Sequence, residues 1–343
     1  MCLNGVIMSK HGVRKNDSFL KSKVAGEHYS ASFYSRCGTC IVCMKRNQTE
    51  WCVRNYYESL DKKYIYFVTL TYNEKIGVCY DGSLIMYDHV QDFLRKCRET
   101  LGEFTYFVGC EYGKDSHRAN YHIIMYSNEA IISDCVLFKK SSVKNNAGVE
   151  IDTSIYKSEN LETIWGNGFV TVQLVEQAPH VVVNYLCEFS PFKGDANYRK
   201  KVLFAKLYGI VAVSDLEKRN SEVSALYKKH KEQRHSSIGL GFNSFYKRID
   251  EFMNTGKVYI GGLEYNIPFS WLEKLSQPEF GYGSDKIPIP YNIRCYARKL
   301  YQDMIEDEKS VSVRLLESQL KGEELTRKYL ENERKRMLGD NYM

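Results

Sequence analysis

The segment that most restricts the fold of this chain is 119–127, which alternates as a β-strand does but carries polar groups on one face. Successive side chains of a strand point to opposite faces of a sheet, so Asn120, His122 and Ile124 share a face. A buried amide and a buried imidazole cost free energy unless they are hydrogen-bonded or bind a metal. We therefore expect the chemistry of this protein to be centred on Asn120 and His122.

The surrounding sequence predicts an α+β fold with an antiparallel sheet and flanking helices. The order β-α-β-β-α-β, followed by one more helix, is that of a split βαβ sheet of the ferredoxin or RRM type. Asp88 is the predicted N-cap of its first crossover helix. The predicted elements are a helix at 44–61, a strand at 63–72, a helix at 87–101, strands at 104–112 and 119–127, a helix at 160–165, a strand at 169–175 and a helix from Pro179 to about Phe189.

Four regions are predicted along the chain. They are an N-terminal cysteine-containing segment at 1–62, the core at 63–195, an extension of helices and a hairpin at 196–300, and a charged helical tail at 301–343.

Several further segments are predicted from their local pattern. The polar stretch 131–154, with Lys139 and Lys140, reads as an inserted surface loop that contacts phosphates, and Thr69 and Thr71 as ordinary strand residues. Later elements are a charged helix at 215–233, a glycine turn at 237–241, a helix at 242–254 and a hairpin at 256–265.

Cysteine usage predicts a reducing compartment, because the eleven cysteines are odd in number and mostly stand singly in apolar patterns. Near the N-terminus, Cys37, Cys40 and Cys43 are each separated by two residues, so their thiolates could converge on one Zn²⁺ with Cys2 as the fourth ligand. The alternative is a set of small buried residues at a turn, since structural zinc sites usually combine two such pairs.

The charge balance favours a nucleic-acid partner over a membrane. Net charge is +6, and the cluster Arg199, Lys200 and Lys201 is a candidate phosphate contact, the alternative being a solvated basic face. No apolar run approaches the ~20 residues needed to span a bilayer. Residues 1–15 lack the apolar core of a signal peptide, so export is not expected.

Eight motifs together resemble the replication initiation proteins of microviruses, in particular the gokushovirus-like branch. These phage proteins are HUH endonucleases, named for a histidine, a hydrophobic residue and a histidine. The order and spacing of the motifs agree through most of the chain. They are Cys37-Gly-Thr-Cys-Ile-Val-Cys with Glu50-Trp51 and Arg54, Phe67-Val-Thr-Leu-Thr-Tyr, Gly109-Cys-Glu-Tyr-Gly, Arg118-Ala-Asn-Tyr-His, Trp165-Gly-Asn-Gly-Phe, Val183-Asn-Tyr-Leu and the weaker Ser237-Ile-Gly-Leu-Gly and Ile267-Pro-Phe-Ser-Trp.

The resemblance implies an HUH-type core and a metal-dependent DNA nickase and strand transferase. Tyr185 would attack a phosphodiester at the origin, leaving a free 3′-OH and a 5′-phosphotyrosine that a second transfer religates. His122, Asn120 and Glu111, with His117 in the preceding loop, would hold Mg²⁺ or Mn²⁺, which polarises the scissile phosphate.

The same resemblance implies the partners and the compartment. Arg118, Lys193 and the cluster Arg199, Lys200 and Lys201 would contact single-stranded DNA at a replication origin. Host replication proteins are expected partners, and the host cytoplasm is the expected compartment.

Three positions depart from the family pattern. Asn120 stands where the family has a histidine, and an amide oxygen is a weaker ligand than imidazole for transition metals, although it suits Mg²⁺ or Mn²⁺. Phe189 replaces a second tyrosine four residues after Tyr185, and Glu188 replaces a lysine.

These departures leave other hypotheses open. One is a non-cleaving DNA-binding protein on the same fold, and another is a zinc-stabilised RNA-binding protein. His122 has a structural alternative as a hydrogen-bonded core residue, and Tyr185 lies in an apolar stripe that would pack on the sheet. Since that stripe would face Asn120 and His122, burial and catalysis are compatible for Tyr185.

Overall fold

The computed structural model describes residues 6–9, 32–35, 41–73, 84–113, 118–144, 150–175, 229–281 and 286–309. The chain divides into two compact units, of which one is Trp51–Arg248 and the other combines Met1–Glu50 with Ile249–Met343. The first unit contains the predicted core sheet.

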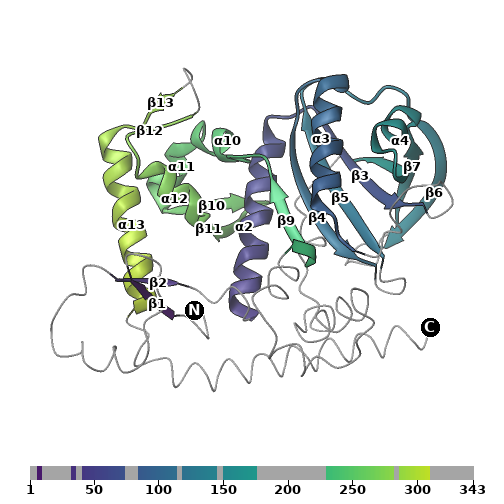
Figure 1. Cartoon of the computed structure of the whole chain (residues 1–343). Coiled ribbons are helices and arrows are strands. Elements are labelled where there is room, and N and C mark those ends of the chain that lie inside the picture. Colours follow the sequence, from purple (N-terminus) through teal and green to yellow (C-terminus); the bar gives the residue numbers. More distant parts are fainter. Residues whose placement is uncertain are drawn as a thin grey trace, which may run out of the picture. The chain divides into compact units, whose positions relative to one another are not determined.

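A seven-stranded antiparallel sheet forms the centre of the Trp51–Arg248 unit, with the strand order β6-β7-β8-β3-β5-β4-β9 (Figure 1). The predicted elements β3, α3, β4, β5, α4 and β8 occur in the predicted order, with the unpredicted strands β6 and β7 between β5 and α4, and the α+β class with an antiparallel sheet is confirmed. The elements are α2 (Ile41–Leu60), β3 (Tyr64–Tyr72), α3 (Tyr87–Leu101), β4 (Thr105–Tyr112), β5 (Ala119–Ser127), β6 (Val136–Lys144), β7 (Glu150–Lys157), α4 (Glu159–Trp165), β8 (Gly168–Leu174), β9 (Gln233–Ser236) and α10 (Phe242–Tyr246).

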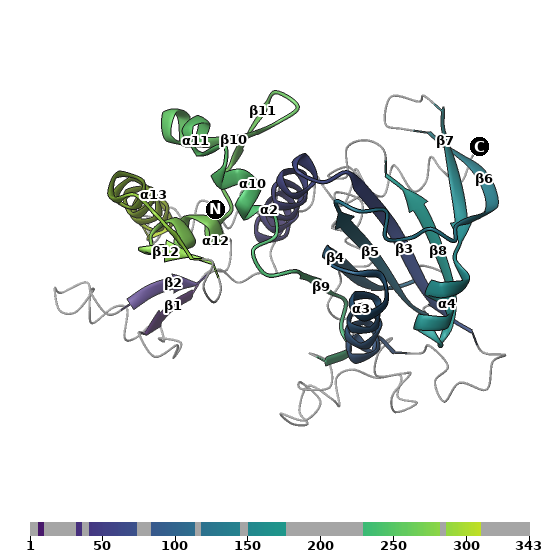
Figure 2. The ribbon, with the colours of Figure 1, turned by 90° about the horizontal axis from the view of Figure 1, so that it is seen from above.

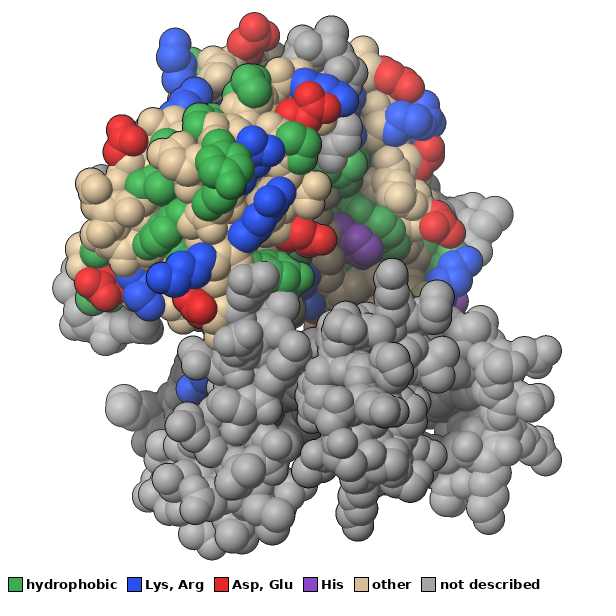
Figure 3. All heavy atoms as spheres, turned by 90° about the vertical axis from the view of Figure 1, so that its left-hand side faces the viewer, with side chains coloured by type: hydrophobic (Ala, Val, Ile, Leu, Met, Phe, Trp, Pro, Cys, Tyr) green, Lys and Arg blue, Asp and Glu red, His purple; other side chains and the backbone are tan. Residues whose placement is uncertain are grey.

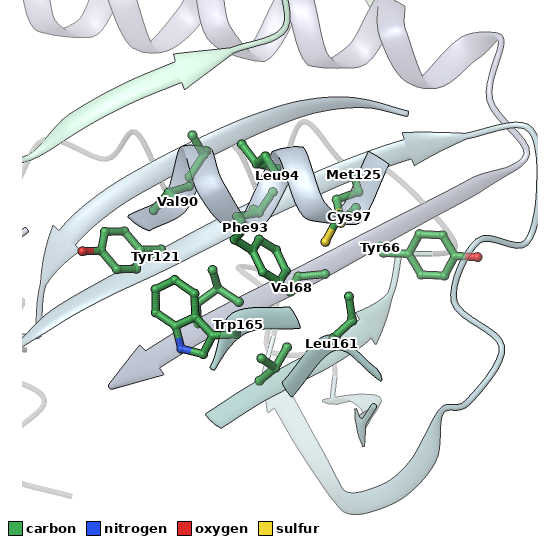
Figure 4. Packing of buried hydrophobic residues seen from close by; sticks show 14 of the residues in the cluster. Tyr66, Val68, Val90, Phe93, Leu94, Cys97, Tyr121, Met125, Leu161 and Trp165 are labelled. Carbon is green, nitrogen blue, oxygen red and sulfur yellow. The ribbon is translucent and has the colours of Figure 1, made fainter. Parts of the chain in front are cut away.

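Helices α3 and α4 pack on the same face of the sheet (Figure 2). Phe93 of α3 meets Trp165 of α4 edge-on, with ring centroids 6.0 Å apart, and both lie over Val68 of β3 (Figure 4). Apolar burial of this kind is the main favourable term in folding. We call this side of the sheet the covered face.

The opposite face is packed at one end by the part of α2 that begins at Trp51. The Trp51 ring lies 5.0 Å from Phe107 of β4, and Cys52 joins the same cluster with Ile124 and Tyr126 of β5. Because side chains alternate along a strand, the half-buried residues nearer the other end of β5 also lie on this face. We call this side, on which α3 and α4 do not pack, the open face.

Buried polar groups fasten α2 to the sheet and to the turn after β9. The Glu58 carboxylate accepts hydrogen bonds from the Thr105 hydroxyl at 2.6 Å and from the Gly241 backbone N–H at 2.7 Å. Ser237 pairs with the backbone of Tyr106 through its own N–H and its hydroxyl. The predicted glycine turn therefore connects β4 to α2, which satisfies buried groups that would otherwise be costly.

The prediction of a surface loop at 131–154 is wrong, since β6 and β7 pair antiparallel over most of this stretch. β6 lies at an edge of the sheet, and its Val136, Leu137 and Phe138 side chains are exposed. An edge strand that buries few side chains has no need of apolar alternation, so its sequence lacks the usual strand pattern.

Three smaller predictions are also wrong. The N-cap of α3 is Met86 without any side-chain cap, rather than Asp88, and the Met86 N–H bonds the Tyr121 hydroxyl at 2.8 Å. The predicted helix 242–254 is interrupted at Lys247 and is divided into α10 and α11 (Ile249–Thr255). The last predicted residue of the 215–233 helix begins β9 instead.

The second unit contains mostly short elements and one long helix. The hairpin predicted at 256–265 is confirmed as β10 (Lys257–Ile260) and β11 (Leu263–Asn266), and Gly261 and Gly262 have the positive φ of a type I′ turn. Besides α11, it contains β1 (Val6–Ser9), β2 (Ser32–Ser35), α12 (Phe269–Leu275), β12 (Glu279–Phe280), β13 (Ile287–Pro288) and α13 (Tyr291–Lys309).

The described surface visible in Figure 3 intersperses basic, acidic and apolar side chains, without a continuous basic patch. Among the described helices, none combines the length and the apolar character that a membrane span requires. Of the predicted charged tail, 301–309 belong to α13 and the remainder lies outside the described residues.

The Trp165-Gly-Asn-Gly segment holds the end of β3 in place. The Trp165 indole N–H donates to the Thr71 carbonyl oxygen at 3.1 Å, and the Asn73 N–H donates to the Asn167 carbonyl oxygen at 3.0 Å. A Cβ on Gly168 would lie 2.3 Å from the Thr71 carbonyl oxygen, so only glycine allows this approach. Gly166 has a left-handed φ of 62°, but a Cβ added there would meet no atom closer than 3.8 Å.

We expect Gly168→Ala to lower the free energy of unfolding by about 3 kcal/mol, because it adds a backbone clash to conformational strain. Gly166→Ala is the matched control and should cost only about 1 kcal/mol, the strain of a left-handed alanine. Urea unfolding followed by circular dichroism measures both. Equal losses would show that the approach to Thr71 is not critical.

We expect Asp61 to make a pH-dependent contribution to the free energy of unfolding. Its carboxylate forms ion pairs with Lys247 at 2.7 Å and with Arg248 at 2.9 Å. The hydrogen bond from Lys247, followed by that from Arg248, holds the pKa of Asp61 well below its ordinary value. The contribution is therefore complete above the unfolded-state pKa of about 3.9 and is lost as the pH falls toward the lower folded-state pKa.

Asp61→Asn should therefore destabilise the protein by about 0.5–1 kcal/mol at pH 7, and the difference should shrink at pH values below about 4. Glu103→Gln is the control, because Glu103 forms no ion pair within the described part of the chain. Urea titrations across this pH range measure the difference. A gap that stays constant with pH would contradict the assignment.

Candidate functional site

Strand register brings three polar side chains together on the open face. His122 of β5 pairs with Thr69 of β3 and with Gly109 of β4, while Asn120 pairs with Thr71 and with Glu111. Directly opposed residues of an antiparallel pair project to the same face. Glu111, Asn120 and His122 therefore lie on the face opposite α3 and α4, as the alternation of 119–127 predicts for Asn120 and His122.

The His122 ring is held from three directions. Its Nδ1 lies 3.1 Å from the Thr69 hydroxyl oxygen, and its Nε2 lies 3.3 Å from Oε1 of Glu111. The Phe67 ring stacks parallel to the imidazole, with 5.6 Å between the centroids. The side chains of His122 and Glu111 are 20% and 14% exposed, so both are partly shielded from solvent yet reachable from the open face.

Tyr121, between Asn120 and His122, points the other way. It is buried on the covered face, where its hydroxyl lies 2.9 Å from that of Tyr72 and accepts the Met86 N–H. Burial raises the pKa of Tyr121 strongly, so the phenol stays neutral. Tyr121 is thus a core residue that holds the polar pair on the opposite face.

Arg118 directly precedes the strand that carries the site. Its Nη2 donates to the Tyr72 carbonyl oxygen at 2.9 Å, and its own carbonyl accepts the Gly113 N–H at 2.8 Å. The guanidinium is therefore held at the end of β3, one residue beyond Thr71. This location is compatible with the predicted DNA contact.

The donor atoms of Glu111 and His122 have a spacing that suits a shared cation. Two ligand atoms at about 2.1 Å from one octahedral ion lie roughly 3.0 Å apart, close to the observed 3.3 Å. The Asn120 amide supplies a further oxygen on the same face. Within the described part of the chain, no three His, Cys, Asp or Glu side chains form a group able to hold a metal. A three-ligand set at this place therefore requires the amide oxygen of Asn120.

Several predicted site residues lie outside the described residues, and their roles stay predictions. Cys43 is described and is buried within α2. Those outside are His117, Tyr185, Lys193, Arg199, Lys200, Lys201, Cys2, Cys37 and Cys40.

Sequence reasoning missed the role of Thr69, which was interpreted as an ordinary strand residue. Alternation along 63–72 places Thr69 on the same face as Phe67 and Thr71, and the structure confirms this. Only the register of β3 against β5 shows that Thr69 contacts His122. A hydroxyl at a β-branched position in a strand is otherwise too common to be informative.

This chain is similar to replication-associated proteins of phages. Residues 65–190 match the family model described as Replication-associated protein ORF2/gene 2 protein. The chain is 20% identical over 244 residues to Replication-associated protein ORF4 of Chlamydia phage 1, covering 69% of this chain and 52% of that protein. It is 24% identical over 147 residues to Replication-associated protein VP4 of Bdellovibrio phage phiMH2K, covering 40% of this chain and 42% of that protein.

The chain thus spans about half the length of the curated relatives it matches. No solved structure matches it. The matched residues include β3, β4, β5 and β8, which form the candidate site and its flank. The resemblance to microvirus replication proteins that the motifs indicate is confirmed.

Proposed function

We propose that this chain, being similar to microvirus replication-associated proteins, initiates rolling-circle replication by nicking single-stranded phage DNA inside the host. Tyr185 is the nucleophile, and the polar cluster on the open face binds the scissile phosphate region. The convergence of Glu111, Asn120 and His122 on that face carries the proposal. A half-buried carboxylate, amide and imidazole gathered at one place are a costly arrangement unless they are hydrogen-bonded or serve a ligand.

The reaction is a transesterification with no net change in the number of phosphodiester bonds. The Tyr185 oxygen forms a bond to phosphorus, and the bond to the 3′-oxygen breaks, which leaves a 3′-OH and a 5′-phosphotyrosine. The 3′-OH is then available as a primer. Attack of a 3′-OH on the phosphotyrosine restores the phosphodiester and releases the tyrosine.

Glu111, Asn120 and His122 are the residues that would hold a divalent cation, with His117 as a further candidate. When bound, Mg²⁺ or Mn²⁺ would polarise the scissile phosphate. His122 can present an unprotonated Nε2 beside Glu111 if its Nδ1–H donates to Thr69. Thr69 is therefore a positioning residue for the imidazole.

A non-cleaving DNA-binding protein on the same fold is the competing function. The substitution of Asn120 for a histidine weakens the donor set for transition metals, and Phe189 removes the second tyrosine. Both departures reduce strand-transfer capacity without removing the DNA-binding surface. A covalent-adduct assay separates the two functions.

We expect the protein to form a covalent adduct with single-stranded oligonucleotides that tile the encoding phage genome, in the presence of Mn²⁺. Tyr185→Phe should abolish the adduct, because only the hydroxyl oxygen can bond to phosphorus. Denaturing gel electrophoresis detects the adduct as a shifted band. Tyr198→Phe is the control and should retain the first transfer, because Tyr198 lies outside the helix expected to carry Tyr185.

The two functions predict opposite results in this assay. An adduct that survives Tyr185→Phe contradicts the assignment of the nucleophile. Tight binding by the unmodified chain without any adduct supports the non-cleaving protein.

We expect Thr69→Val to weaken Mn²⁺ binding about tenfold, because loss of the hydroxyl frees the His122 ring to reorient. Thr171→Val is the matched control, since Thr171 pairs with Thr69 from β8 on the same face but makes no described contact with His122. Electron paramagnetic resonance of free Mn²⁺ measures both affinities without DNA. Equal affinities in the two variants would refute the positioning role.

A further inference from the structure

We propose that Phe138 of β6, Lys157 of β7 and Phe169 of β8 form a stacking surface for single-stranded DNA beside the candidate site. The bases stack on the two phenyl rings, and the lysine binds a phosphate. The inference rests on the proposed function in taking DNA as the ligand. The proposal adds a DNA-contact surface. Of its three residues, only Phe169 belongs to a motif shared with the microvirus proteins.

The three side chains are adjacent, and the two rings are exposed while Lys157 is half-buried. The Lys157 Nζ lies 4.2 Å from the centroid of the Phe138 ring and 5.8 Å from that of Phe169. Phe138 is 57% exposed and Phe169 is 46% exposed. Exposing two large aromatic rings to water is unfavourable, so two such rings around one cation indicate a binding site for a partner.

Strand register connects this stacking surface with the candidate site. Thr71 of β3 pairs with Phe169 on one side and with Asn120 on the other. Opposed residues share a face, so Phe169 lies on the open face two strands from Asn120. At about 4.8 Å per strand, the two backbones are roughly 10 Å apart, a distance that a strand bound at Asn120 can cover within a few nucleotides.

The charges at this end of the sheet favour a nucleic acid. Lys139 pairs with Ile155, two residues before Lys157, so both lysines project to the same face. Neither forms an ion pair with an acidic residue in the described segments, nor does the exposed Lys140. Exposed aromatic rings combined with cations that follow a backbone are the arrangement that binds single strands with little sequence preference.

Pairing of β6 with a second copy of the chain is the less favoured explanation of the exposed residues. β6 is an edge strand, but its pairing is irregular between Leu137 and Lys139, and Lys139 and Lys140 follow. Bulges and lysines on an edge strand oppose intermolecular pairing. The experiment nevertheless includes self-association as an outcome.

Fluorescence anisotropy with a labelled oligothymidylate of about 20 nucleotides tests the proposal on the full chain. We expect Phe138→Leu and Phe169→Leu each to raise Kd about fivefold or more, because leucine keeps the apolar volume but cannot stack. Phe138→Trp should keep the affinity. Leu174→Ala is the matched control, since Leu174 is an exposed apolar residue of β8 on the opposite face.

Salt dependence separates the role of the lysine from that of the rings. Lys157→Gln should make the negative slope of log binding constant against log salt concentration shallower by about 0.7. This is the value for one phosphate contact on a single strand. The two leucine variants should leave this slope unchanged.

The outcomes distinguish this proposal from the nicking proposal. Ring-dependent binding without any Tyr185 adduct supports the stacking surface and rejects only nicking. Adduct formation with unchanged Kd in both leucine variants overturns the stacking surface and leaves nicking intact. Absence of oligothymidylate binding, or a loss of self-association in Phe138→Leu with unchanged Kd, also overturns it.

Discussion

The pairing of β5 between β3 and β4 is the constraint on which the remaining structure depends. Side chains alternate with a period of two, so a slip of one residue would move Asn120 and His122 into the core and Tyr121 onto the open face. The buried Tyr121 hydroxyl opposes such a slip, because it bonds Tyr72 and Met86 on the covered face. The contacts of Thr69 and Glu111 with His122 oppose it from the open face.

The two faces of the sheet therefore differ in composition and in what packs on them. α3 and α4 bury the covered face with large apolar side chains, which stabilises the fold. On the open face, α2 covers only the end around Phe107 and Ile124 among the described residues. Polar side chains can therefore remain half-buried near Asn120, where the lower local dielectric strengthens the interactions between them.

Patterns with a short repeat were predictable from the sequence. The alternation in 63–72 and 119–127, the apolar stripe of 87–101 and the Gly261-Gly262 turn each depend on neighbouring residues, and all were found as predicted. The strands at 136–157 were not predictable, because β6 is at an edge and exposes Val136, Leu137 and Phe138. The prediction of Asp88 as the N-cap of α3 was wrong because the start of this helix depends on a tertiary contact. The Met86 N–H donates to the hydroxyl of Tyr121, which belongs to a strand distant in sequence.

The sequence by itself therefore determined the order of the core elements, the face shared by Asn120 and His122, and the resemblance to microvirus replication proteins. Local periodicity encodes which side chains face together along one strand. The tertiary structure alone decided which strands are neighbours. This register brings Glu111 and Thr69 to His122, and Phe169 to the same face as Asn120, because contacts between strands join residues far apart in the chain.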